Sequence, residues 1–146
     1  IEKARLDFGG HLYYMDSQGY NKGEAVGIRN PLCPDEVMAT VTLKNQSIST
    51  SADYERNFNI LGRTYSHLID PCAGQPAEGD ILSASVISDS SLVSDIFSTA
   101  VFILGLKQGM ELIEDMDNVE ALIITNNQGM PEIHSSLDRA SQKCRP

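Results

Sequence analysis

Asp95 and Thr99 are the pair of side chains whose types and spacing most directly suggest chemistry. They lie four residues apart in a stretch that is expected to be helical, so both side chains project from the same face of the helix. A carboxylate and a hydroxyl aimed at a common point are hard oxygen ligands, the kind that Mg²⁺ prefers. The spacing suggests a magnesium site, although an aspartate on the polar side of an amphipathic helix is more often simply solvated.

A second group of polar side chains gathers at the mouth of a predicted hairpin. Two extended runs, Tyr54–Ile60 and Arg63–Ile69, flank Gly62, which can adopt the positive φ of a tight turn. The outer ends of these runs carry the polar clusters Ser49–Asp53 and His67–Asp70. Because the two ends of a hairpin lie close together, we expect these clusters to meet.

The residues of these clusters have structural as well as chemical interpretations. His67 shares one face of the predicted strand with Tyr65 and Ile69. A histidine there can be a general base or a hydrogen-bonded structural residue. Ser51 and its neighbours can line a site or cap a turn. The residues alone leave both alternatives open.

The elements that would position these side chains are strands followed by two helices and a last hairpin. Alternating apolar residues and turn signals predict the strands, and a long apolar periodic run closed by Gly105 predicts the first helix. This order is typical of an α+β fold with a mainly antiparallel sheet and a pair of consecutive helices on one face. The predicted strands are 4–8, 11–15, Glu24–Asn30, Val37–Leu43, Ile81–Ser88, Val119–Thr125 and Met130–Ser135, and the helices are Leu92–Leu104 and Lys107–Asp115.

Length, charge and cysteine spacing exclude several classes of protein. With 146 residues the chain is expected to form a single domain, and with a net charge of −9 and no basic stretch it is not expected to bind nucleic acid. The three cysteines do not have the spacing of a zinc site or a disulfide framework.

Five segments, in the same order, resemble motifs of the ApbE family of flavin transferases (FAD:protein FMN transferases). The family motifs include a Thr-Ser-Gly-Asp-Tyr-x-Arg motif, a Tyr-His-His-Ile-Ile-Asp-Pro motif and a helix that contains Asp, Thr and a terminal Leu-Gly. One match alone would be weak evidence, whereas five in the right order are a specific signal. The matching segments here are Leu6–Gly10, Val26–Pro31, Thr50–Arg56, Tyr65–Pro71 and Ser94–Gly105.

The resemblance implies a T-fold-like α+β fold and a magnesium-dependent reaction. FMN would be transferred from FAD to a Thr or Ser hydroxyl of a partner flavoprotein, a subunit of a membrane redox complex, with release of AMP. By position, Asp95 and Thr99 match the family's metal ligands. His67 matches a base or diphosphate contact, and Ser51 and Ile69 match cofactor-binding positions.

Some positions depart from the family's pattern. Ala52 replaces the motif glycine, Ser66 replaces the first paired histidine, Cys72-Ala73 replaces a basic-Thr pair, and His11 stands where Asn or Asp is usual. These departures keep open an alternative function, a non-catalytic FAD-binding protein of the same fold. A third interpretation is a structural or interaction domain with degenerate motifs.

Family members are much longer than this chain. The resemblance therefore implies the carboxy-terminal part of such an enzyme, without the amino-terminal half that carries much of the FAD pocket. A second chain could supply that half, and without it the fragment is expected to be inactive. Family members are often exported lipoproteins, so the resemblance also implies a periplasmic location and a lipid anchor.

Overall fold

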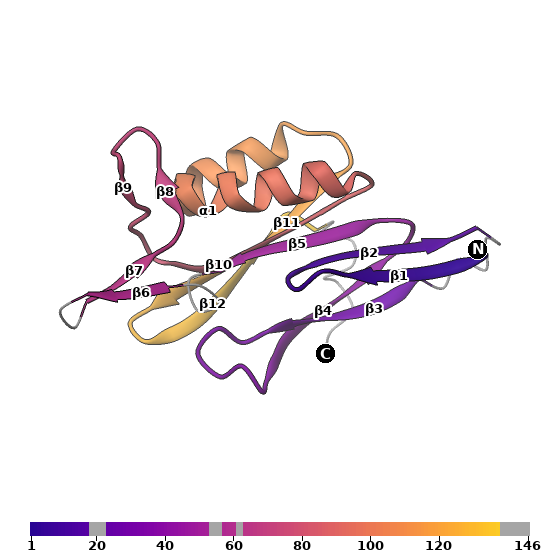
Figure 1. Ribbon diagram of the computed structural model, residues 1–146, viewed down its shortest axis with the longest axis horizontal. Helices are drawn as coiled ribbons and strands as arrows, with labels where there is room; N and C mark the ends of the chain where they lie inside the picture. The colour runs from indigo at the N-terminus through magenta and orange to yellow at the C-terminus, as the bar shows by residue number, and fades with distance from the viewer. Residues whose placement is uncertain (18–22, 53–56, 61–62, 138–146) are drawn as a thin grey trace.

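The computed structural model describes residues 1–17, 23–52, 57–60 and 63–137 (Figure 1). Its centre is a six-stranded sheet, in which each pair of neighbouring strands is antiparallel. In spatial order the strands are β1 (Lys3–Asp7), β2 (His11–Asp16), β5 (Ser47–Ala52), β10 (Ile81–Ser88), β11 (Val119–Asn127) and β12 (Met130–Ser135). The predicted α+β class with a mainly antiparallel sheet is confirmed.

Three two-stranded pairs accompany this sheet. They are β3 (Glu24–Arg29) with β4 (Val37–Leu43), β6 (Asn57–Ile60) with β7 (Arg63–Ser66), and β8 (Ile69–Asp70) with β9 (Gln75–Pro76). In Figure 1, β3 and β4 lie on one side of the main sheet and the helix α1 (Ser91–Glu114) lies on the other. The main sheet is therefore the middle layer.

Each face of the main sheet has its own apolar core. The core toward β3 and β4 includes Leu43 and Ile124, both 0% exposed. The core toward α1 is formed by apolar side chains of β10 and β11 with Val101 and Phe102 of the helix. Because successive residues of a strand point to opposite faces, strands such as β10 supply side chains to both cores. Strands buried on both faces hold the site described below on a rigid support.

The predicted hairpin is shorter than expected. β6 and β7 pair from Asn57 with Ser66 to Ile60 with Arg63, and residues 54–56 and 61–62 lie outside the described residues. The prediction that the second strand continues to Ile69 is wrong, because Ile69 pairs with Pro76 in the separate β8–β9 ladder. The Ser66 hydroxyl accepts a hydrogen bond from the Leu68 N–H at 3.2 Å, which removes this donor from the β6–β7 ladder.

The predicted pair of consecutive helices forms one assigned element, α1, which consists of two helical segments joined across a kink. α1 spans 24 residues and is interrupted at Gly105, whose backbone has φ 83° and ψ 170°. The first segment ends at Gly105, as predicted, and the chain resumes helical geometry after this one non-helical residue. Glycine is the residue that adopts such angles without steric cost.

The buried face of α1 also differs from the predicted apolar face. Leu92 and Ile96, which the periodicity assigns to that face, are 68% and 52% exposed. Ser94 and Ser98 are instead fully buried, together with Val101. Apolar residues occur on several sides of this helix, so periodicity alone does not single out one face. The small hydroxyl side chains pack against polar partners on β5, which no helical wheel can show.

α1 is long and apolar enough to cross a membrane, by length and composition alone, with a mean hydropathy of 1.4. This is weak evidence for a membrane span, because the core helix of a soluble protein has the same properties. In this fold the helix packs against the sheet through Val101 and Phe102.

Candidate functional site

The site begins with three serines on one face of β5. Ser47, Ser49 and Ser51 alternate along the strand, so their side chains share the face that is covered by α1. Ser47 and Ser49 are 0% and 3% exposed. The hydroxyl of Ser47 lies 2.6 Å from that of Ser94 on the helix and donates to the Ser88 carbonyl at 3.3 Å. A buried seam of hydroxyl groups therefore joins the strand to the helix.

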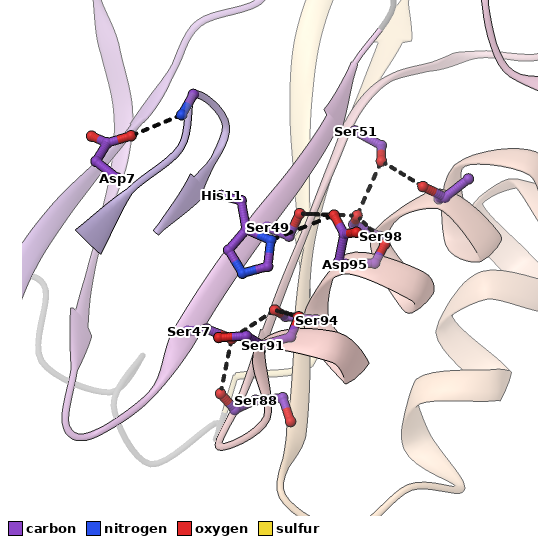
Figure 2. A network of polar contacts seen from close by, with 12 residues as sticks. Asp7, His11, Ser47, Ser49, Ser51, Ser88, Ser91, Ser94, Asp95 and Ser98 are labelled. Carbon is purple, nitrogen blue, oxygen red and sulfur yellow. Dashed lines mark hydrogen bonds and ion pairs between the residues drawn. The ribbon is translucent and has the colours of Figure 1, made fainter. Parts of the chain in front are cut away.

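Farther along this seam, the two predicted metal ligands each contact a serine of β5. Ser49 Oγ donates to Asp95 Oδ1 at 3.1 Å, and Ser51 Oγ lies 3.2 Å from Thr99 Oγ1. Ser98 lies between them, with its hydroxyl 3.0 Å from Ser51 Oγ and 3.5 Å from Ser49 Oγ. Figure 2 shows Ser49, Ser51, Asp95 and Ser98 gathered at this point.

The β1–β2 turn brings a further side chain to Asp95. Gly9 and Gly10 have φ values of 71° and 80°, the positive angles that a two-residue hairpin turn requires. The Thr50 N–H donates to the Gly10 carbonyl, and His11 pairs with Ser49 across β2 and β5. His11 Nδ1 consequently lies 3.5 Å from Asp95 Oδ1 (Figure 2). The Gly-Gly pair thus forms a simple hairpin turn.

These elements border a pocket of about 670 Å³. Its lining includes four of the five predicted site residues, which are Ser51, His67, Asp95 and Thr99. Ile69 does not line it, and its side chain is 51% exposed. The expectation that the two polar clusters meet is thus confirmed for Ser49–Ala52 and His67, whereas Asp53 lies outside the described residues. Of the two interpretations of Ser51 and its neighbours, the residues line a site and do not cap a turn, since they continue β5.

His67, which lines the pocket, carries an unpaired polar atom. Its Nδ1 is buried and has no hydrogen-bond partner among the described residues. An unsatisfied buried polar group costs about 1–3 kcal/mol, so a ligand group that supplied the missing partner would bind favourably. The neighbouring Asp70 has a structural role, because its carboxylate accepts a hydrogen bond from the Cys72 N–H at 2.8 Å.

The donor atoms fit a hard cation that is completed by ligand oxygens. Among the described residues, no group of three or more His, Cys, Asp or Glu side chains could hold a metal ion. Asp95, with a side chain 64% exposed, and the Thr99 hydroxyl remain as oxygen donors at the pocket. Mg²⁺ is commonly held by one or two carboxylates together with substrate phosphates and water. The residues present therefore fit Mg²⁺ better than a metal that needs an all-protein cage.

Sequence reasoning did not find the contacts made by Ser49 and His11. The signal for Ser49 was the alternation of serines at 47, 49 and 51, which matches a strand with one polar face. The helix supplies matching hydroxyl groups at Ser94 and Ser98. For His11, nothing in its local sequence indicated Asp95 as a partner.

Comparison with known proteins gives the family. The sequence profile of the ApbE family matches residues 1–123. The chain is 31% identical over 130 residues to an FAD:protein FMN transferase of Klebsiella pneumoniae, covering 88% of this chain and 39% of that protein. It is 38% identical over 128 residues to one of Buchnera aphidicola subsp. Schizaphis graminum, covering 86% of this chain and 36% of that protein. The chain spans somewhat under two fifths of the length of these relatives.

Solved structures agree with this assignment. The ApbE protein of Thermotoga maritima matches with a TM-score of 0.80 and 26% identity, covering 99% of this chain and 45% of that one. The apo flavinyl transferase ApbE of Pseudomonas stutzeri matches with a TM-score of 0.73 and 28% identity, covering 93% of this chain and 42% of that one. The fold is thus ApbE-like, and with the profile match over most of its length, the chain belongs to the ApbE family.

Proposed function

We propose that this chain forms the metal-binding and diphosphate-binding side of an FAD:protein FMN transferase. The enzyme would transfer FMN from FAD to a Thr or Ser hydroxyl of a partner flavoprotein and release AMP. The observation that carries this proposal is the single pocket lined by His67, Asp95 and Thr99. Membership of a family whose relatives are FAD:protein FMN transferases supports it.

The reaction needs little covalent chemistry from the protein. The acceptor hydroxyl oxygen forms a bond to the phosphorus of the FMN half, and the P–O bond to the AMP phosphate breaks. Such transfers depend mainly on positioning and on neutralising the phosphate charge, which is what Mg²⁺ supplies when bound. The Asp95 carboxylate and the Thr99 hydroxyl would hold the ion from one face of α1.

His67 would act on the acceptor hydroxyl or on the diphosphate. As a base, it would take the proton that the hydroxyl loses when the new P–O bond forms. As a donor, it would hydrogen-bond a phosphate oxygen. The buried, unpaired Nδ1 supports a role that is completed by a ligand. Either role places the reacting diphosphate between His67 and the two helix residues.

The two other predicted cofactor contacts have different surroundings. The Ser51 hydroxyl contacts Ser98 and Thr99 on α1, so its first effect would be on the metal ligand. Ile69 lies at the edge of the fold and pairs with Pro76, and a backbone contact from Ile69 to FAD stays a prediction. The T-fold-like arrangement stays a prediction as well.

A non-catalytic FAD-binding protein is the second candidate function, motivated by the departures from the family motifs. The structure weakens one of them. Ala52 is 2% exposed, lies at the end of β5 and is absent from the residues with positive φ, so its backbone conformation does not need glycine. The serine at position 66 has a structural role of its own, since its hydroxyl accepts a hydrogen bond from the Leu68 N–H. The catalytic function is therefore the better supported of the two.

The wider setting of the reaction is proposed from the family resemblance. We propose a flavoprotein subunit of a membrane redox complex as acceptor, and a periplasmic location with a lipid anchor. Since the chain spans under two fifths of its relatives' length, the rest of the FAD site would come from an amino-terminal half, on the same chain or a second one.

The test uses the full-length protein with FAD, Mg²⁺ and an acceptor domain that carries the target threonine. We expect covalent flavin on the acceptor, detected by fluorescence of the denatured protein in a gel. An acceptor with that Thr replaced by Val should remain unlabelled. Normal FAD binding without any transfer to the intact acceptor would overturn the proposed reaction.

Asp95→Ala separates the two candidate functions. A transferase should lose Mg²⁺-dependent transfer in this variant, while a pure binding protein should keep its FAD and show no transfer with or without the substitution. Asp89→Ala is a matched control, because this aspartate also lies near the start of α1 but does not line the pocket. The control should transfer flavin as the unsubstituted protein does.

A further inference from the structure

The two candidate metal ligands on α1 each contact a serine on β5, and the spacing of these serines matches that of the ligands. Residues four apart in a helix are separated by about 6 Å along its axis, and residues two apart in a strand by about 6.6 Å. Ser49 and Ser51 on β5 can therefore meet Asp95 and Thr99 on α1 at the same time. The observed contacts are 3.1 Å from Ser49 Oγ to Asp95 Oδ1 and 3.2 Å from Ser51 Oγ to Thr99 Oγ1.

The carboxylate of Asp95 is held through one of its two oxygens. Within the described part of the chain, its contacts with Ser49 and His11 are both made by Oδ1. Oδ2 makes no hydrogen bond or ion pair there. Two contacts on one oxygen limit rotation of the carboxylate and leave the other oxygen available to a cation at the pocket.

The supporting serines are joined through the buried Ser98, and Ser49 is buried while Ser51 is half-buried. Ser49 is 3% exposed and Ser98, which lies against Ser49 and Ser51, is 0% exposed. Ser98 also donates to the Asp95 carbonyl at 2.9 Å, as expected for a helix serine turned back on its own backbone. Burial of Ser49 and Ser98 keeps water from competing for their hydroxyl groups, so the protein sets the geometry of these contacts.

We propose that Ser49 and Ser51 are positioning residues of the metal site. They orient the Asp95 carboxylate and the Thr99 hydroxyl before the cation arrives, so that little reorganisation accompanies binding. Groups that hydrogen-bond a metal ligand typically change metal affinity 10- to 100-fold when they are removed. This inference rests on the proposed function, because it assumes that Asp95 and Thr99 bind the metal.

The experiment measures Mn²⁺ affinity of the full-length protein by the electron paramagnetic resonance signal of free Mn²⁺, without FAD or acceptor. Mn²⁺ serves as a probe because it shares the oxygen ligands of Mg²⁺. We expect Ser49→Ala and Ser51→Ala each to weaken Mn²⁺ binding about 10- to 100-fold. Ser51→Thr, which keeps a hydroxyl at a half-buried position, should retain the affinity of the unsubstituted protein.

Ser47→Ala is the matched control for a merely structural effect. Ser47 lies on the same strand and face and is fully buried, but its hydroxyl contacts Ser94, which is not a candidate metal ligand. Its removal should lower the melting temperature to a similar extent as Ser49→Ala while changing Mn²⁺ affinity less than twofold. Equal losses of affinity in the two variants would overturn the proposal.

The remaining outcomes separate this inference from the proposed function. If Asp95→Ala binds Mn²⁺ as tightly as the unsubstituted protein, the proposed metal site is wrong. Both the proposed function and the positioning role of the serines are then contradicted. If Asp95→Ala loses Mn²⁺ but Ser49→Ala and Ser51→Ala do not, the positioning role alone is wrong. A serine-dependent Mn²⁺ site in a protein that transfers no flavin would contradict the transferase and leave the positioning role standing. If circular dichroism shows that Ser49→Ala does not fold, the Mn²⁺ affinities of Ser51→Ala and Ser51→Thr test the positioning role instead.

Discussion

His11 Nδ1 lies 3.5 Å from Asp95 Oδ1, and this contact joins the β1–β2 hairpin to the first turns of α1. The Asp95 side chain is 64% exposed and that of His11 is 23% exposed. The pair therefore sits at the border between the buried seam and the pocket.

Replacing His11 with alanine should change stability little. An ion pair with one largely exposed partner contributes about 0–1 kcal/mol, so we expect the free energy of unfolding of His11→Ala to fall by less than about 1 kcal/mol. Urea denaturation measures it, with Leu43→Ala as the reference. Leu43 is 0% exposed, and its truncation should cost about 2–5 kcal/mol. A loss above about 2 kcal/mol for His11→Ala would contradict the border position of the pair.

Substitution of His67 should lower flavin transfer without lowering the stability of the fold. Its Nδ1 is buried and unpaired, so His67→Leu removes an unsatisfied polar group, and we expect stability to stay the same or rise by about 1 kcal/mol. Loss of an acid–base group typically lowers the rate 10²- to 10⁴-fold, and flavin transfer should fall by that order. Thermal unfolding and covalent flavin incorporation are measured on the same preparation. A strongly destabilised variant would instead show that His67 is structural.

Gly105 should tolerate alanine poorly. Its φ of 83° and ψ of 170° lie in a region that is essentially restricted to glycine, where another residue costs about 1–3 kcal/mol. Space is not the obstacle, because an added Cβ meets nothing within 4 Å. Gly79→Ala is the control, since Gly79 has equally open surroundings without the unusual φ. We expect the melting temperature to fall for Gly105→Ala and to stay the same or rise slightly for Gly79→Ala. Equal effects would mean that the kink does not need glycine.

Removal of metal should abolish flavin transfer reversibly. A site built on one carboxylate and one hydroxyl leaves most of the metal's ligands to substrate phosphates and water, so chelation by EDTA should strip it readily. Added Mg²⁺ should restore covalent labelling of the acceptor in the unsubstituted protein and fail to do so in Asp95→Ala. Full transfer in the presence of EDTA would show that the reaction does not depend on a metal.

The sequence predicted the parts whose local pattern is strong. The strands β4, β10 and β12 have the predicted bounds, because alternating side chains and flanking turn residues define them locally. The i, i+4 spacing of Asp95 and Thr99 likewise brings both to one pocket. The family motifs identified the family, since their residues keep the same order along the chain.

The tertiary structure decided which side of α1 is buried and what holds the site. Leu92 and Ile96 are exposed and Ser94 and Ser98 are buried, because the strand facing the helix carries hydroxyl groups at matching intervals. A helical pattern reports the residues of one element, whereas burial depends on the surface of another element far away in the chain. The residue types of the candidate site and their order along the chain were thus predictable from the sequence. The contacts of Asp95 with Ser49 and His11 became visible only in the packed fold.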